Sequence, residues 1–258
     1  ENAKKKVVVL ISYGDPYIAT THLELKTRAI RDNIETNTIH SSSIVSSLIG
    51  EVGLHYYKVG KILTIMNDAK SMVTPYNIIF DNLLNHAHSV ILLEYNEDKS
   101  FFLAPENALS LLLDIEKNQN RKVISSETFG IIASRIGKSN QKITSGKISN
   151  LIKNKFGEPP HSIIIPGSLH FTESDALKIV TECLDTPFDN SANLKNISEQ
   201  MIEKYVPMVR DALEEIKPHY ENIKEYEDVL INAKLYIDDA ENFLKEGKKE
   251  YAVLSIGY

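Results

Sequence analysis

Strand-like and helix-like patterns alternate along residues 7–184, and this alternation limits the possible folds more than any other feature. The run Val-Val-Val-Leu-Ile at 7–11 is typical of a strand in the buried centre of a parallel sheet. The pattern predicts an α/β sandwich with mostly parallel strands. Further strands are expected at 36–40, 62–66, 89–95, 128–134 and 162–165, and helices at 20–33, 43–49, 76–87, 104–117, 145–156 and 173–184.

The pattern changes after Pro187. Residues 189–258 show only helical periodicity, interrupted at Pro218 and Gly247, and they predict a separate α-helical appendage. Charge follows the same division, because residues 1–188 carry 20 basic and 20 acidic side chains while 189–258 carry 9 and 15. A neutral body with an acidic tail argues against a nucleic-acid partner, which would need clustered positive charge.

Composition places the chain among ordinary globular proteins. Of its 258 residues, 42% are hydrophobic and 25% charged, and the single cysteine, Cys183, has no partner for an internal disulfide. No apolar run approaches the roughly 20 residues of a membrane helix, and no signal peptide opens the chain. We therefore expect a cytoplasmic protein without a membrane partner.

Both ends predict that the printed chain is an internal piece of a longer protein. It begins with Glu1, and the run at 7–11 would need neighbouring strands on both sides. At the other end, residues 251–258 begin an apolar helix after Gly247 and then stop.

Polar residues lie at the ends of three of the expected strands. Gly14-Asp15-Pro16 follows the first, where open α/β sheets bind ligands, although Gly, Asp and Pro are also the commonest turn residues. Residues 40–44, His-Ser-Ser-Ser-Ile, are equally explained as a polar pocket or as a helix N-cap. His161 opens the last strand, and a single histidine there is more often structural than catalytic.

Several chemistries lack their motif. There is no Gly-x-Ser-x-Gly elbow, no phosphate-binding Gly-x-x-x-x-Gly-Lys-Ser/Thr loop, and no His-Glu-x-x-His or paired cysteines. Serine hydrolysis, nucleotide hydrolysis and a metal site are therefore not expected.

Taken in order, four motifs resemble the diphthine synthase family of the tetrapyrrole-methylase superfamily over roughly residues 5–184. They are Gly-Asp-Pro-x-x-Ala-Thr-Thr-His (14–22), His-x-x-Ser-Ile (40–44), Gly-Leu-His-x-Tyr-Lys-x-Gly-Lys (53–61) and Phe-Gly-x-Pro-Pro-His-x-x-x-x-Pro-Gly-x-Leu-His (156–170). The resemblance implies a two-lobed fold: residues 1–53 as the remainder of an incomplete N-terminal lobe, 54–186 as the C-terminal lobe and 189–258 as the appendage. The appendage itself resembles a small archaeal helical domain of unknown function through Tyr236-x-x-Asp-Ala-x-x-Phe-Leu-x-x-Gly247.

By the same resemblance, the enzyme uses S-adenosylmethionine to methylate the amino group of a modified histidine on translation elongation factor 2, and relatives are homodimers. No catalytic base is implied. Ile136 stands where relatives commonly have alanine, and the family's opening strands and Gly-rich turn are absent from the 258 residues. The cofactor contacts that the resemblance implies are Asp15, Ile18, Ser43, Ile44, Leu93, Ile136 and His161.

Two alternatives remain open. One is a corrin-type small-molecule methyltransferase of the same superfamily, with the same cofactor and a different acceptor. The other is a non-catalytic scaffold that acts through its helical tail.

Overall fold

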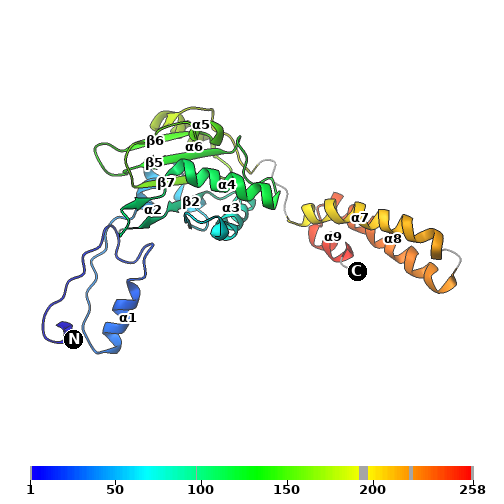
Figure 1. Cartoon of the computed structure of the whole chain (residues 1–258), viewed down its shortest axis with the longest axis horizontal. Helices are drawn as coiled ribbons and strands as arrows, with labels where there is room; N and C mark the ends of the chain where they lie inside the picture. The colour runs from blue at the N-terminus through cyan, green and yellow to red at the C-terminus, as the bar shows by residue number, and fades with distance from the viewer. Residues whose placement is uncertain (1, 97, 192–196, 221–222, 257–258) are drawn as a thin grey trace. The chain divides into compact units, whose positions relative to one another are not determined.

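The computed structural model describes residues 2–96, 98–191, 197–220 and 223–256, and the chain divides into two compact units, Glu1–Ala192 and Asn193–Tyr258 (Figure 1). The α/β sandwich and the helical appendage are both confirmed. The further division of the first unit at residues 53 and 54 stays a prediction. Among the described residues, no helix combines the length and apolar character that crossing a bilayer requires.

A six-stranded sheet organises the first unit, in the order β1-β2-β7-β5-β6-β8. These strands are β1 (Leu63–Ile65), β2 (Ser89–Leu93), β5 (Phe129–Ser134), β6 (Lys142–Lys147), β7 (His161–Ile165) and β8 (Glu182–Cys183). The helices of this unit are α1 (Leu23–Arg31), α2 (Ile44–Glu51), α3 (Val73–Leu84), α4 (Pro105–Gln119), α5 (Ile148–Leu151) and α6 (Phe171–Val180). Short elements complete it: the 3-10 turns η1 (Asn2–Lys4), η2 (Tyr56–Lys58) and η3 (Ala69–Met72), and the hairpin of β3 (Tyr95–Asn96) with β4 (Phe101–Phe102).

The expectation of mostly parallel strands is wrong. Only β1 with β2 and β6 with β8 are parallel, while β2 with β7, β7 with β5 and β5 with β6 are antiparallel. The sequence predicts a helix over 145–156, but residues 142–147 form β6, which pairs along its whole length with β5, and helix α5 covers only Ile148–Leu151. The short connection 135–141 permits this antiparallel return, since a parallel neighbour would need a longer crossover.

Two further strands predicted near the N-terminus are absent. Residues 7–12 and 34–43 have no strand pairing, and Val7 and Ile11 are 93% and 89% exposed. A strand requires hydrogen-bonding neighbours, and among the described residues nothing pairs with this run. Helix α1, which follows it, has no buried residue.

The core lies on both faces of the sheet. Val90, Ile164 and Ile131 come from three neighbouring strands and pack with Leu48 of α2 and Leu177 of α6. The next residue along each strand points to the opposite face, where α3 and α4 pack against β1, β2 and β7 (Figure 1).

Local sequence explains where several helices begin and end. Pro105 opens α4, where its missing N–H costs nothing, and Asn120 ends that helix in a left-handed conformation. Ser43 caps α2, because its hydroxyl accepts a hydrogen bond from the backbone N–H of Val45.

The second unit is helical, with α7 (Ile197–Tyr220), α8 (Lys224–Lys245) and α9 (Lys249–Ile256). Its core is a cluster formed by Ile202, Val206, Ile237 and Ala252. Arg210 of α7 joins α8 through ion pairs of 2.9 Å with Asp238 and 3.1 Å with Glu241.

Candidate functional site

Asp15 organises the turn that follows residues 7–12. Its side chain is buried; one carboxylate oxygen accepts a hydrogen bond from the N–H of Tyr17 at 2.9 Å, and the other lies 2.7 Å from Nδ1 of His40. The Tyr17 N–H and then His40 lower the pKa of Asp15 below its ordinary value. Asp15 therefore ties the 14–18 turn to the 40–44 segment as a carboxylate.

The same two segments also approach through their backbones. A Cβ added at Gly14 would lie 3.3 Å from the carbonyl oxygen of Ser42, which is tighter than most such contacts, and Gly14 has φ +69. Ser43 is buried as the cap of α2, and Ile44 is the first residue of that helix. Asp15, Ser43 and Ile44 thus come together, with Ile18 in the turn that Asp15 holds.

A second group of predicted residues meets at one edge of the sheet. Leu93 ends β2, whose Leu92 pairs with Ser162 of β7. His161 opens β7 and pairs with Ser134, the last residue of β5. Strand register therefore places Leu93 and His161 at one sheet edge, and Ile136 follows the end of β5 at that edge by two residues.

Helix α2 links the two groups. It begins at Ile44, and its Leu48 and Ile49 belong to the core cluster against which Ile136 packs. The Nε2 of Gln141, in the loop after β5, also donates a 2.8 Å hydrogen bond to Glu51 at the end of the helix. The sheet edge and the 40–44 segment therefore border the same helix.

Two buried nitrogens at this edge have no hydrogen-bond partner within the described ranges: Nδ1 of His161 and Nε of Arg135. The Nε2 of His161 lies 3.2 Å from the carbonyl oxygen of Gly157, which can only accept, so Nε2 carries the proton and Nδ1 presents a lone pair. Burial lowers the pKa of His161 and favours this neutral form, against the raising effect of the Gly157 carbonyl. A buried polar atom without a partner in the chain needs one from outside it, such as a ligand, an ion or a water molecule.

A buried carboxylate network is the feature that the sequence analysis missed. Glu173 is fully buried, and its oxygens accept hydrogen bonds from Nζ of Lys58 (2.6 Å), the N–H of His55 (2.8 Å), the N–H of His170 (2.8 Å) and Nε2 of His88 (2.9 Å). Burial alone would raise the pKa of Glu173, but these donors outweigh it and hold the pKa at about 2.

The network also fixes the state of His88. Its Nδ1 accepts a 3.1 Å hydrogen bond from the N–H of Gly167, so its Nε2 is the protonated nitrogen that donates to Glu173. Burial lowers the pKa of His88 and keeps the ring neutral. The network thereby fastens residues 55–58, which lie within the 53–61 motif, to residues 167–173, which begin within the 156–170 motif and extend beyond it to Glu173. The motifs include Lys58, His55 and His170, but Glu173 and His88 lie outside them, so no sequence signal pointed to the network.

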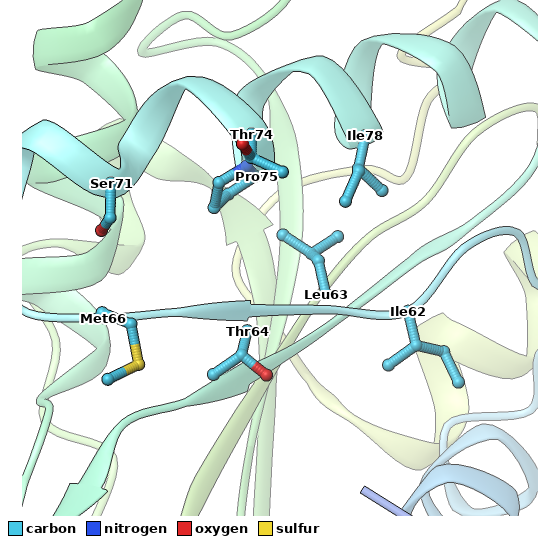
Figure 2. A pocket seen from close by; sticks show the side chains of 8 residues that line it. All are labelled: Ile62, Leu63, Thr64, Met66, Ser71, Thr74, Pro75 and Ile78. Atoms are coloured by element: carbon cyan, nitrogen blue, oxygen red, sulfur yellow. The ribbon is translucent and has the colours of Figure 1, made fainter.

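Other features offer little chemistry. No group of three or more His, Cys, Asp or Glu side chains in the described part of the chain is arranged to hold a metal ion. Figure 2 shows a pocket of about 490 Å³ between β1 and the η3–α3 segment, with no ionisable side chain in its lining. Leu63 points toward α3 in this view. The lining residues are Ile62, Leu63, Thr64, Met66, Ser71, Thr74, Pro75 and Ile78, and none of them is a predicted site residue.

Comparisons with known proteins point in one direction. Residues 1–152 match the family described as Tetrapyrrole (Corrin/Porphyrin) Methylases, and residues 204–258 match one described as Protein of unknown function (DUF357). The chain is similar to the diphthine synthase of Methanococcus maripaludis (strain C5), with 41% identity over 184 residues that cover 70% of this chain and 72% of that protein.

Two further relatives agree. The diphthine synthase of Methanocaldococcus jannaschii is 39% identical over 186 residues, which cover 70% of this chain and 72% of the relative. A crystal structure of diphthine synthase matches with a TM-score of 0.64 and 29% identity, over 70% of this chain and 68% of that one.

Proposed function

Because the chain belongs to the diphthine synthases, which are methyltransferases of the tetrapyrrole methylase family, we propose that it methylates the amino group of the modified histidine of translation elongation factor 2, with S-adenosylmethionine as donor. The observation that carries the proposal is the convergence of Leu93, Ile136 and His161 at one sheet edge. The same three residues are among the donor contacts that the resemblance implies.

The residues present fit such a donor. The orphaned Nδ1 of His161 can accept a hydrogen bond from an adenine or ribose group, and Leu93 and Ile136 supply apolar wall. Asp15 orders the turn at 14–18, and Gly14 lets the backbone come close. In this proposal the segments 14–18 and 40–44 form one side of the site and the sheet edge forms the other.

When bound, S-adenosylmethionine supplies a sulfonium methyl group that an amine nitrogen attacks in line, so that the methyl–sulfur bond breaks as the methyl–nitrogen bond forms. The chain has to hold the reacting atoms in near-attack geometry and exclude water, which contributes more than acid–base help when the amine arrives deprotonated. We assign no catalytic base. The proton leaves the methylated nitrogen for solvent.

Donor binding tests the site directly through two matched aspartates. Asp15 and Asp68 each accept a hydrogen bond from the backbone N–H two residues later, at 2.9 and 3.0 Å, but only Asp15 lies in the proposed site. We expect Asp15→Asn to weaken S-adenosylhomocysteine binding by about 10-fold or more, and Asp68→Asn to leave it unchanged. Equal affinities in both variants, measured by calorimetry, would exclude Asp15 from the site.

A corrin-type small molecule is the second candidate acceptor, favoured by the description of the matching family. An assay with S-adenosylmethionine labelled in its methyl group, run with each acceptor, distinguishes the two functions. Each function predicts label in only one of the two products. We also propose that the chain acts in the cytoplasm, where the elongation factor works, and that it forms a homodimer, which analytical ultracentrifugation tests.

A further inference from the structure

Arg135 lies at the sheet edge, next to Ile136 in the sequence and close to His161 through the pairing of Ser134. Both neighbours are predicted donor contacts, but the proposed function gives Arg135 no role. It follows the last residue of β5, and its N–H donates a 3.0 Å hydrogen bond to the carbonyl oxygen of Pro160, next to His161. Its φ of 53 lies in the left-handed region, which a non-glycine residue adopts at a cost. Such positions cluster at ligand-binding sites.

The guanidinium of Arg135 is only partly used. Its Nη1 pairs with Oε2 of Glu158, whose side chain is 75% exposed. Its Nε is buried and has no partner within the described ranges. A buried charged donor without an acceptor is unfavourable, and the Nε side of a guanidinium is one of the edges that receive a planar carboxylate through two parallel hydrogen bonds.

The unpartnered Nδ1 of His161 is the complementary atom. Register places His161 beside Ser134, the residue before Arg135, so both orphaned atoms belong to neighbouring positions on adjacent strand ends. One is a charged donor and the other a neutral acceptor. The ligand that satisfies both atoms brings an anionic acceptor to Nε of Arg135 and, as in the proposed function, an N–H or O–H donor to Nδ1 of His161.

We propose that Arg135 binds the carboxylate of an α-amino-acid head group at this site. The inference rests on the proposed function, in which both reactants carry that group: the methionine end of the donor and the aminocarboxypropyl chain on the acceptor histidine. Neither reactant contains a phosphate, so a carboxylate is the anion that the guanidinium meets. Arg135 is then a binding residue that fixes the orientation of one reactant.

The test compares the wild-type chain with Arg135→Gln and Arg135→Lys. Arg28→Gln is the matched control, because Arg28 also pairs with one glutamate, Glu24, but lies on the exposed helix α1. Calorimetry measures binding of S-adenosylhomocysteine and of methylthioadenosine, which lacks the amino-acid head group. A second arm measures binding of elongation factor 2 with and without the aminocarboxypropyl histidine. Thermal unfolding reports whether each variant is folded, and Arg135→Lys carries the test if the glutamine variant is not.

If Arg135 holds the donor carboxylate, Arg135→Gln weakens the binding of S-adenosylhomocysteine by about 10- to 100-fold. The affinity for methylthioadenosine stays within about 3-fold of the wild-type value. If Arg135 holds the acceptor carboxylate, both nucleosides bind as they do to the wild-type chain. The ratio of the affinities for elongation factor 2 with and without the modified histidine then falls about 10-fold or more. In either case Arg135→Lys loses less, since it keeps the charge without the fork, and Arg28→Gln loses nothing.

Equal loss of both nucleosides, or no change in either arm, overturns the inference while leaving the proposed function intact. A wild-type chain that binds neither nucleoside overturns the proposed function, and the inference with it.

Discussion

Replacing Glu173 with glutamine tests the buried network that joins residues 55–58 to 167–173. The substitution keeps the shape of the side chain but removes its charge and one acceptor oxygen. All four partners donate to Glu173: two backbone N–H groups, the ammonium of Lys58, and Nε2 of His88. The Nε2 of His88 is a donor because its Nδ1 accepts from the Gly167 N–H. An amide presents only one oxygen, so some donors face its NH2 group and lose their acceptor.

The magnitude follows from the burial of the charge. Glu173 is fully buried and the side chain of Lys58 is 19% exposed, so Glu173→Gln leaves an ammonium group largely removed from water without its counter-charge. Removing one member of a buried pair costs about 3–5 kcal/mol, which is a large fraction of the 5–15 kcal/mol stability of an ordinary domain. We expect the unfolding free energy of the first unit to fall by that amount.

Equilibrium urea unfolding measures the change, followed by circular dichroism. The control is Glu182→Gln, which breaks a 2.9 Å pair with Lys142 between half-exposed side chains and is expected to cost about 1 kcal/mol or less. Lys58→Met alone should also destabilise the chain. The double variant Lys58→Met/Glu173→Gln should cost less than the sum of the single variants. A Glu173→Gln chain within about 1 kcal/mol of wild type, or strictly additive costs, would refute the reasoning.

Three more predictions concern stability. Burial lowers the pKa of His88 in the folded chain, so below about pH 6.5 the unfolded chain takes up a proton at this residue more readily than the folded chain does. The contribution of His88 to the unfolding free energy is therefore constant above about pH 6.5 and is lost as the pH falls further, by at most about 1.4 kcal/mol per pH unit. Urea titrations at pH 7, 6 and 5 should show a flatter slope for His88→Gln. Gly167→Ala would put a Cβ 2.6 Å from the carbonyl oxygen of Ala87, and thermal unfolding should show a loss of about 1–3 kcal/mol; an unchanged melting temperature would mean that this contact is not close. Ile237→Ala should destabilise the second unit by about 2–5 kcal/mol and leave the first unit's transition in place, whereas a shift of both transitions would show that the units unfold together.

Local patterns were enough to locate most of the sheet. Strands β2, β5 and β7 are apolar runs buried on both faces, and α4 carries its proline in the first turn as expected. The strand β6 could not be located in the same way, because Lys-Ile-Thr-Ser-Gly-Lys at 142–147 is a strand only through its pairing with β5. Without β6, the antiparallel direction of the neighbouring strands could not be predicted either. The run at 7–11 shows the opposite limit, since strong strand propensity does not make a strand where no described neighbour pairs with it.

Long-range polar contacts explain the rest of the difference. Lys58 and Glu173 are separated by 115 positions, and nothing local to either residue indicates that they meet. The serine at 43 was equally consistent with a pocket and with a cap, and the cap is present. His161 was placed at the site by resemblance, but only the register with Ser134 and the unpartnered Nδ1 give that placement a physical reason.

Methyl transfer measured by mass spectrometry tests the central claim most directly. Purified chain is incubated with S-adenosylmethionine and archaeal elongation factor 2 that carries the aminocarboxypropyl histidine, and the peptide with that histidine is analysed. Elongation factor with an unmodified histidine is the control acceptor. The account predicts added methyl groups on the modified histidine alone, and loss of transfer in Asp15→Asn. A folded chain that binds S-adenosylhomocysteine yet leaves the modified histidine unmethylated would contradict it.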